Sequence, residues 1–187
     1  MPSALASHGP LDGFSWPQTE AFSLRIAPPA ARLVLRGDGA VAAAAGAAFG
    51  VAIPQTPLRA AAAAGRVALW LGPDEWLLMS EGEAPTLLAA MLEDALKQLP
   101  HSLVDVSQRQ IGLQIEGANA ARALNAGCPL DLSPAAFAVG AATRTMLAKA
   151  EIVLWRRGAN AFHIDVWRSF ADYAAKFLVE AAARAPR

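Results

Sequence analysis

An internal repeat is the feature of this 187-residue sequence that most constrains its fold. The alternating run at 32–37 matches 112–117 at an offset of about 80 residues, and an Ala-rich segment follows each run. The match resumes with 67–70 against 152–155, each followed by a turn and another strand-like run. Because alternation of apolar and polar residues is typical of half-buried strands, we predict an α+β fold of two halves. Each half should have the order strand, strand, helix, strand, strand, helix.

The boundaries of the halves follow from composition and pattern. Residues 1–20 hold three Pro and no periodicity, which predicts an irregular N-terminal arm. Residues 21–100 and 101–187 are then the two halves, with opening strands at 22–27 and 103–107, and a strand at 142–147 that is extra in the second half. Units of about 80 residues bury too little surface to stand well apart. We therefore expect one compact body.

Two helices are predicted from apolar residues spaced three and four positions apart. One begins at Pro85, and the other, near Phe170, has Ser169 and Asp172 in a capping-box-like arrangement. The outer face of the second helix carries acid-before-base pairs at four-residue steps. These are Asp172, Lys176, Glu180 and Arg184.

The overall charge and hydropathy exclude several classes of protein. Lys and Arg total 16 and Asp and Glu total 16, so the chain lacks the basic excess that nucleic-acid binding requires. Hydrophobic residues make up 55%, which is too many for a disordered chain. The longest uncharged window, 39–58, is mostly Ala with interrupting Gly and Pro, and is too weakly apolar for a membrane span. Residues 1–20 lack Lys, Arg and a continuous apolar core, so we expect no signal peptide and a cytoplasmic location.

One turn fits a relaxed dinucleotide-binding motif, G-x-G-x-x-A at 37–42. A nucleotide site also needs an acidic residue about 20 positions later for the ribose, and 56–65 contain none. The repeat places 117–120 at the equivalent turn, where Asp38 and Asn119 are both suited to cap a helix. A plain strand-to-helix turn is the favoured interpretation.

Cysteine and histidine chemistry has little support. The histidines His8, His101 and His163 and the single Cys128 lack the spacing of zinc ligands. Cys128 with His101 or His163 would need a third orienting group to act as a nucleophile pair. We favour Cys128 as a small buried hydrophobe and His163 as an outward polar residue of a strand.

Two carboxylates, Asp105 and Asp165, are embedded in apolar strands. Burial would raise the pKa of either group and suit it to acid or base catalysis. The favoured alternative is a structural ion pair with one of three nearby arginines. The candidates are Arg109, Arg144 and Arg168.

The five tryptophans are the stronger signal. Trp70 and Trp155 occupy equivalent repeat positions and face away from the apolar side chains of their strands. Trp and Arg are enriched at interface centres, which makes a subunit interface one interpretation. A sheet face covered by the chain's own helices is the other, and the pattern leaves both open. The candidate interface comprises Trp70, Trp76, Trp155, Arg156, Trp167 and Arg168.

Six strings, spread over about residues 20–184 in the expected order, together resemble one family. They lie at 71–78 (LGPDEWLL), 103–107 (LVDVS), 128–133 (CPLDLS), 143–145 (TRT), 149–156 (KAEIVLWR) and 166–171 (VWRSFA). The chain resembles the gamma subunit of heterotetrameric sarcosine oxidase, whose fold is similar to part of the folate-binding aminomethyltransferases.

The resemblance implies a non-catalytic subunit of a flavoenzyme that demethylates sarcosine to glycine, yielding hydrogen peroxide and, with tetrahydrofolate, methylenetetrahydrofolate. It implies alpha, beta and delta subunits as partners, with FAD, FMN and NAD in the alpha and beta subunits and zinc in the delta subunit. We expect no catalytic, cofactor-binding or metal-binding residue in this chain, and neither a nucleic-acid nor a membrane partner. One alternative is a stand-alone folate-dependent one-carbon transferase that uses Asp105 or Asp165. Another is the gamma subunit of a related N-methyl amino-acid oxidase.

Overall fold

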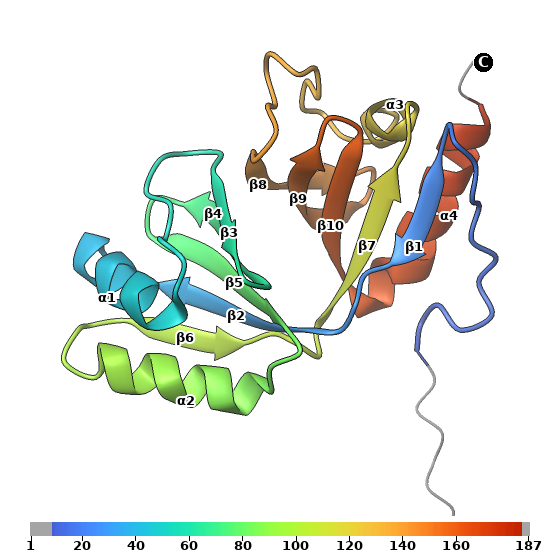
Figure 1. The fold of residues 1–187 in the computed structure, drawn as a ribbon. Helices are drawn as coiled ribbons and strands as arrows, with labels where there is room; N and C mark the ends of the chain where they lie inside the picture. The colour runs from blue at the N-terminus through green and yellow to red at the C-terminus, as the bar shows by residue number, and fades with distance from the viewer. Residues whose placement is uncertain (1–8, 185–187) are drawn as a thin grey trace, which may run out of the picture.

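Two antiparallel five-stranded sheets, with helices on their outer sides, form the molecule (Figure 1). The computed structural model describes residues 9–184, so positions 1–8 of the predicted arm and 185–187 lie outside the described residues. The first sheet runs β3 (Ala60–Ala63), β4 (Arg66–Gly72), β5 (Glu75–Glu81), β2 (Ala30–Arg36) and β6 (Ser102–Asp105). The second runs β1 (Ser23–Ile26), β7 (Gln110–Glu116), β10 (Ala161–Trp167), β9 (Ala150–Gly158) and β8 (Ala142–Leu147). The helices are α1 (Gly39–Phe49), α2 (Pro85–Leu96), α3 (Ala120–Asn125) and α4 (Ala171–Ala183), with a short 3₁₀ turn at Arg168–Phe170.

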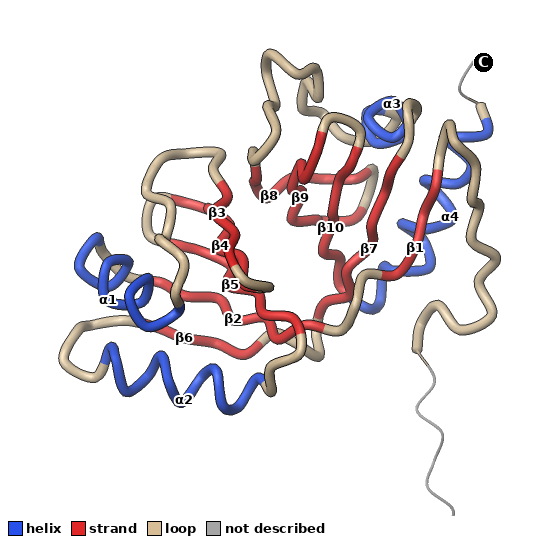
Figure 2. Tube along the Cα trace, viewed as in Figure 1, coloured by secondary structure: helices blue, strands red, loops and turns tan. Residues whose placement is uncertain are grey.

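The two halves exchange their opening strands. β1 pairs with β7 of the second sheet, and β6 pairs with β2 of the first, so each half donates one edge strand to the other. The links between the sheets run side by side, because the Ala27 amide donates to the Gly112 carbonyl and the Val106 amide donates to the Arg32 carbonyl (Figure 2). Separating the halves would therefore break two strand ladders. The two halves are thus tied together by backbone hydrogen bonds in both sheets.

The predicted α+β fold is confirmed, with one difference in strand count. The strand expected as an addition to the second half, β8, has a counterpart in β3 of the first half. β3 consists of four alanines, which have low strand propensity and show no alternation. Its pairing with β4, rather than its own sequence, makes it a strand.

Three apolar layers hold the sheets and helices together. One outer core lies between the first sheet and helices α1 and α2, and the other lies between the second sheet and helices α3 and α4. The third layer fills the space between the inner faces of the two sheets. It contains Leu69, Leu71, Leu77, Met79, Val106, Ala142 and Val153. Each sheet is therefore covered on both faces by the chain itself.

The C-terminal helix differs from its predicted start. The residues 168–170 form the 3₁₀ turn, and α4 begins at Ala171 without a side-chain cap, so the capping box at Ser169 was wrong. The acid-before-base pairs are confirmed, since Lys176 bonds Asp172 at 2.8 Å. Phe170, near which the helix was predicted to begin, is 40% exposed. Within residues 9–184, no helix is long and apolar enough to cross a bilayer.

The helix cap at Asp38 gives a test of the repeat. The Asp38 carboxylate accepts hydrogen bonds from the amides of Ala40 and Val41 at 2.9 and 3.0 Å, whereas Asn119, its repeat counterpart, makes no side-chain cap bond. We expect Asp38→Ala to lower the free energy of unfolding by about 1 kcal/mol. Asn119→Ala is the matched control and should change it far less. Equal losses in urea unfolding would contradict this assignment.

Candidate functional site

A buried polar cluster joins the inner faces of the two sheets. The Arg32 Nε on β2 donates to Asp165 Oδ1 on β10 at 2.7 Å, and His163 Nε2 lies 3.1 Å from Asp165 Oδ2. Arg32 and His163 are each 4% exposed, and Asp165 is fully buried. The fold brings together Arg32 and Asp165, which are 133 residues apart in the sequence.

The cluster fixes the charge on Asp165. Burial alone would raise the pKa of its carboxyl, but the charges and hydrogen bonds of His163 and Arg32 outweigh burial and hold the pKa below its usual range. The carboxylate is therefore ionised at neutral pH and has both oxygens occupied. A general base needs a pKa near the working pH and access to a substrate proton. Asp165 has neither.

The sequence predicted the pairing of Asp165 but not its partner. The ion-pair hypothesis is confirmed for Asp165, and the choice of Arg109, Arg144 or Arg168 was wrong. Arg144 instead bonds Glu75 across the two sheets at 2.5 Å. The outward orientation of His163 was also wrong, because the face it occupies is covered by the other sheet and not by water.

Asp105 has a different environment from Asp165. It is exposed on edge strand β6, and its carboxylate accepts a hydrogen bond from the Ser107 amide at 2.8 Å. No arginine pairs with it among the described residues. Its role in the structure is to hold the turn that leads into the link between the sheets.

Glycine is required directly beneath the cluster. A Cβ at Gly112 would lie 2.8 Å from Ala27 Cβ, Arg32 Nη2 and His163 Cε1. Such distances are shorter than van der Waals contact, so any larger residue would displace the cluster. Because Gly112 has no side chain, β7 can pack directly against the Arg32 side chain.

The cysteine and histidine candidates do not meet. Cys128 is 5% exposed and its closest polar partner is Thr145 Oγ1, 3.9 Å away. His101 directly precedes β6 of the first sheet, with its ring bonded to the Leu99 carbonyl and Glu93. In the part of the chain that the structure describes, no three His, Cys, Asp or Glu side chains cluster as metal ligands do.

The tryptophans divide into buried and exposed members. Trp76 is 1% exposed and donates its Nε1 hydrogen to the Pro54 carbonyl, so it has no surface to offer another subunit. Trp70 and Trp155 are partly buried. Trp167 is 41% exposed, with the Arg109 guanidinium 5.2 Å from its ring centre. Trp70, Trp155, Trp167 and the exposed Arg168 remain a predicted interface.

Arg156, the remaining interface candidate, is buried, as Trp76 is. Its guanidinium donates to the carbonyls of Leu132 and Phe137 at 3.0 and 2.7 Å and lies over the Phe162 ring. Because Arg156 pairs with Phe162 as Trp70 pairs with Trp76, Arg156 is the structural counterpart of Trp70. The repeat alignment was therefore one residue out at this strand, which reverses the face assigned to a side chain.

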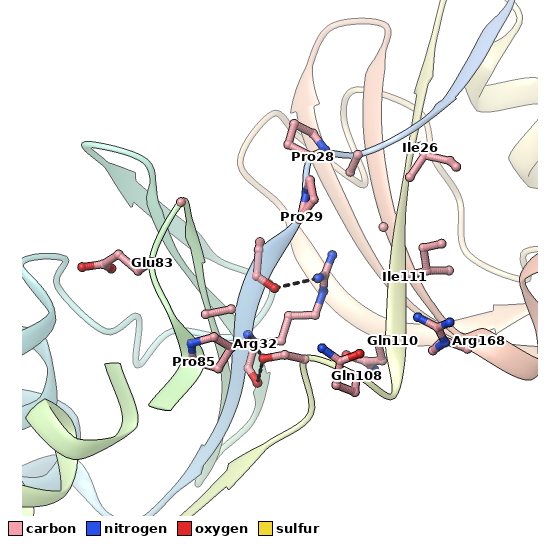
Figure 3. Close-up of a pocket in the computed structure, with 16 residues that line it drawn as sticks. Ile26, Pro28, Pro29, Arg32, Glu83, Pro85, Gln108, Gln110, Ile111 and Arg168 are labelled. Carbon is pink, nitrogen blue, oxygen red and sulfur yellow. Dashed lines mark hydrogen bonds between the residues drawn. The ribbon is translucent and has the colours of Figure 1, made fainter. Parts of the chain in front are cut away.

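An open pocket lies where the two links cross between the sheets (Figure 3). It has a volume of about 460 Å³. Its walls are formed by 26–32, by Gly82, Glu83 and Pro85, by 107–108 and 110–112, and by Arg168. Ser107, Arg32 and Glu83 in its wall are all engaged in other hydrogen bonds. Gln110 is 9% exposed and its Oε1 has no hydrogen-bond partner. The sequence carried no signal for this pocket, since its walls come from both halves.

The buried ion pair predicts a large stability effect. Asp165→Asn leaves the Arg32 charge buried without a counter-ion, so we expect the free energy of unfolding to fall by about 3–5 kcal/mol. Arg32→Met combined with Asp165→Leu removes both charges and should recover most of that loss. Urea denaturation measures both variants. A loss below about 1 kcal/mol for Asp165→Asn would show that the pair contributes little.

The lowered pKa of Asp165 also predicts a pH dependence. A depressed folded-state pKa stabilises the protein above the unfolded pKa of about 3.9, and this stabilisation is lost as pH falls through the folded value. The stability difference between wild type and Asp165→Asn should therefore shrink on acidification from about pH 5 to about pH 2. Asp74→Asn, at an exposed pair with Arg36, is the control and should show little difference at any pH.

Comparison with known proteins now tests the resemblance. The family model described as "Sarcosine oxidase, gamma subunit family" matches residues 36–184. The sarcosine oxidase subunit gamma of Corynebacterium sp. (strain U-96) is 39% identical over 145 residues, covering 78% of this chain and 68% of that protein. The subunit gamma from Arthrobacter sp. is 37% identical over 141 residues, covering 74% and 68%.

Solved structures agree with the sequence relatives. A chain of the heterotetrameric sarcosine oxidase from Corynebacterium sp. U-96, in complex with pyrrole 2-carboxylate, superposes with a TM-score of 0.87 at 33% identity, covering 97% of this chain and 98% of that one. The aminomethyltransferase T of the glycine cleavage system from Bartonella henselae shares the fold, with a TM-score of 0.64 at 13% identity, covering 83% and 45%. The resemblance and the fold expected from it are confirmed, and the chain belongs to the sarcosine oxidase gamma subunit family.

Proposed function

We propose that this chain is the non-catalytic gamma subunit of a heterotetrameric sarcosine oxidase. The observation that carries the proposal is its similarity, over 97% of its length, to a chain of such an enzyme. The proposed complex oxidatively demethylates sarcosine to glycine, with hydrogen peroxide and methylenetetrahydrofolate as further products. Alpha, beta and delta subunits are the proposed partners, in the cytoplasm.

The chemistry is assigned to the partner subunits. FAD, FMN, NAD and zinc are proposed to lie there, and tetrahydrofolate is a co-substrate of the complex. The state of this chain's own titratable groups supports that division. Asp165 is ionised and enclosed, Cys128 is buried, and Asp105 holds a turn. The contribution proposed for this chain is therefore to bind its partners and stabilise their arrangement.

The exposed aromatic and basic residues after β10 are the proposed contact with those partners. Trp167 and Phe170 are 41% and 40% exposed, and Arg168 lies between them in the chain. Large aromatic side chains beside arginine are typical of interface centres. Trp70 and Trp155 are proposed as lesser contributors, because each is already partly covered.

A folate-dependent aminomethyl transferase is the second candidate, favoured by the fold shared with aminomethyltransferase T. Its chemistry would have to come from Asp105, because Asp165 is inaccessible. The gamma subunit of an oxidase for another N-methyl amino acid is a variant of the first proposal, and it differs only in the substrate bound by a partner subunit.

Co-expression with candidate partner genes tests the first proposal. We expect the tagged chain to co-purify with flavin-containing subunits, and omission of the chain to reduce the yield of assembled, active oxidase. The reason is that surface exposed in the free chain becomes covered on assembly. A stable monomer that does not co-purify with these partners would contradict the proposal.

Tetrahydrofolate titration separates the two candidates. We expect the chain alone to show no calorimetric binding, because the first proposal assigns the folate-dependent chemistry to the partner subunits. Binding that is lost in Asp105→Asn but kept in Asp74→Asn, an exposed control, would favour the transferase.

A further inference from the structure

The pocket at the crossing of the two links has polar groups that are incompletely satisfied. Three of its polar side chains have partners: Arg32 bonds Asp165, Ser107 bonds the Arg32 backbone, and Glu83 bonds Arg66. Gln110 and Arg168 differ. The buried Gln110 Oε1 has no hydrogen-bond partner, and no ion pair to Arg168 occurs among the described residues.

The charge in and around this pocket is positive. Its one lining carboxylate, Glu83, is held by Arg66 at 2.5 Å, and the buried Arg32 charge is balanced by Asp165. Arg168 adds a charge with no counterpart in the wall. Arg109 lies next to it, because the Arg168 amide donates to the Arg109 carbonyl, and its guanidinium rests on Trp167. A carboxylate would complement this rim.

The remaining wall is apolar and partly exposed. Ile26 is 42% exposed, and Figure 3 shows it with Ile111 and Arg168 along one side of the pocket. Pro28 and Pro29 form the crossing segment, and their backbone nitrogens cannot donate hydrogen bonds. In the chain, Arg168 lies between Trp167 and Phe170, which are both exposed. A ligand that fits must therefore combine a carboxylate, a hydrogen-bond donor and apolar groups along an open groove.

We propose that this pocket receives an extended acidic segment of a partner subunit, with an Asp or Glu carboxylate on Arg168 and a backbone N–H on the Gln110 amide. This rests on the proposed function, since it names where a subunit of the complex binds. A polypeptide segment fits better than a free small acid because the groove is open and because exposed aromatic residues lie next to Arg168 in the chain. Charge complementarity of this kind fixes the register of an interface.

Two variants in the assembled complex test the proposal. Arg168→Glu should weaken retention of this chain by about 10-fold or more in a salt-dissociation series, because it places like charges together. Arg168→Lys should retain most of the affinity. Arg59→Glu, at another exposed arginine with no ion pair among the described residues, is the matched control and should leave retention unchanged.

Gln110→Leu separates binding from folding. It removes a buried polar atom that lacks a partner, so the stability of the free chain should be unchanged or higher. Retention in the complex should nevertheless fall, because the partner's donor loses its acceptor. A purely structural role for Gln110 would instead lower stability and leave retention unaltered.

A photo-crosslinking residue at Ile26, followed by mass spectrometry, identifies the occupant. The expected product joins Ile26 to a partner segment containing Asp or Glu. An assembled complex that gives no such product, or that tolerates Arg168→Glu, overturns the pocket proposal and leaves the proposed function standing. Thermal stabilisation of the chain by glutarate without a crosslink would assign the pocket to a small acid and also overturn it. Failure of the wild-type chain to assemble at all would instead contradict the proposed function.

Discussion

The ion pair between Arg32 and Asp165 is the interaction on which the arrangement of the two sheets depends. Strand exchange brings β2 and β10 face to face, and the charged side chains then meet in a space that is otherwise apolar. Each charge would be strongly unfavourable alone in that space, so the sheets must keep a relative position that holds the two groups 2.7 Å apart. His163 and Gly112 complete the packing, one by bonding the free carboxylate oxygen and the other by leaving room. Arg144 and Glu75 form a second ion pair between the two sheets, and solvent weakens this pair because its side chains are partly exposed.

The same arrangement explains most of the unusual hydropathy. A chain with 55% hydrophobic and 17% charged residues appears at first to lack a solvent face. The three apolar layers account for much of this excess, because each sheet is covered by helices on one side and by the other sheet on the other. What remains for partners is a set of single exposed apolar side chains on several elements. Ile26, Trp167 and Phe170 are among them, and Leu87 on α2 and Val104 on β6 are exposed elsewhere.

Local features of the fold could be predicted from the sequence, whereas long-range pairings could not. The Asp38 cap, the α2 helix and the strands other than β3 follow from short-range rules and were confirmed. Strand exchange is invisible to such rules, since alternation shows that a segment is a strand without showing its neighbour. Because the neighbouring sheet could not be predicted, His163 was wrongly assigned to the solvent face. For the same reason, Arg32 was not recognised as the partner of Asp165. At Arg156 the error was one of register, because a one-residue slip gave Trp155 the sheet face that Arg156 occupies.

The residues at the crossing of the links both hold the two sheets together and line the pocket proposed to bind a partner. Arg32 lines the pocket while its Nε bonds Asp165, and Gly112 lies beneath both the pocket and the ion pair. Any partner that occupies the pocket would contact segments belonging to both halves at the point where they exchange strands. Binding there would stabilise the folded, assembled chain by mass action, because the unfolded chain presents no such surface. A fold shared with aminomethyltransferase T can in this way serve a binding role, since Arg32, His163 and Asp165 hold the two sheets together and the unpartnered Gln110 lies in the pocket wall at their junction.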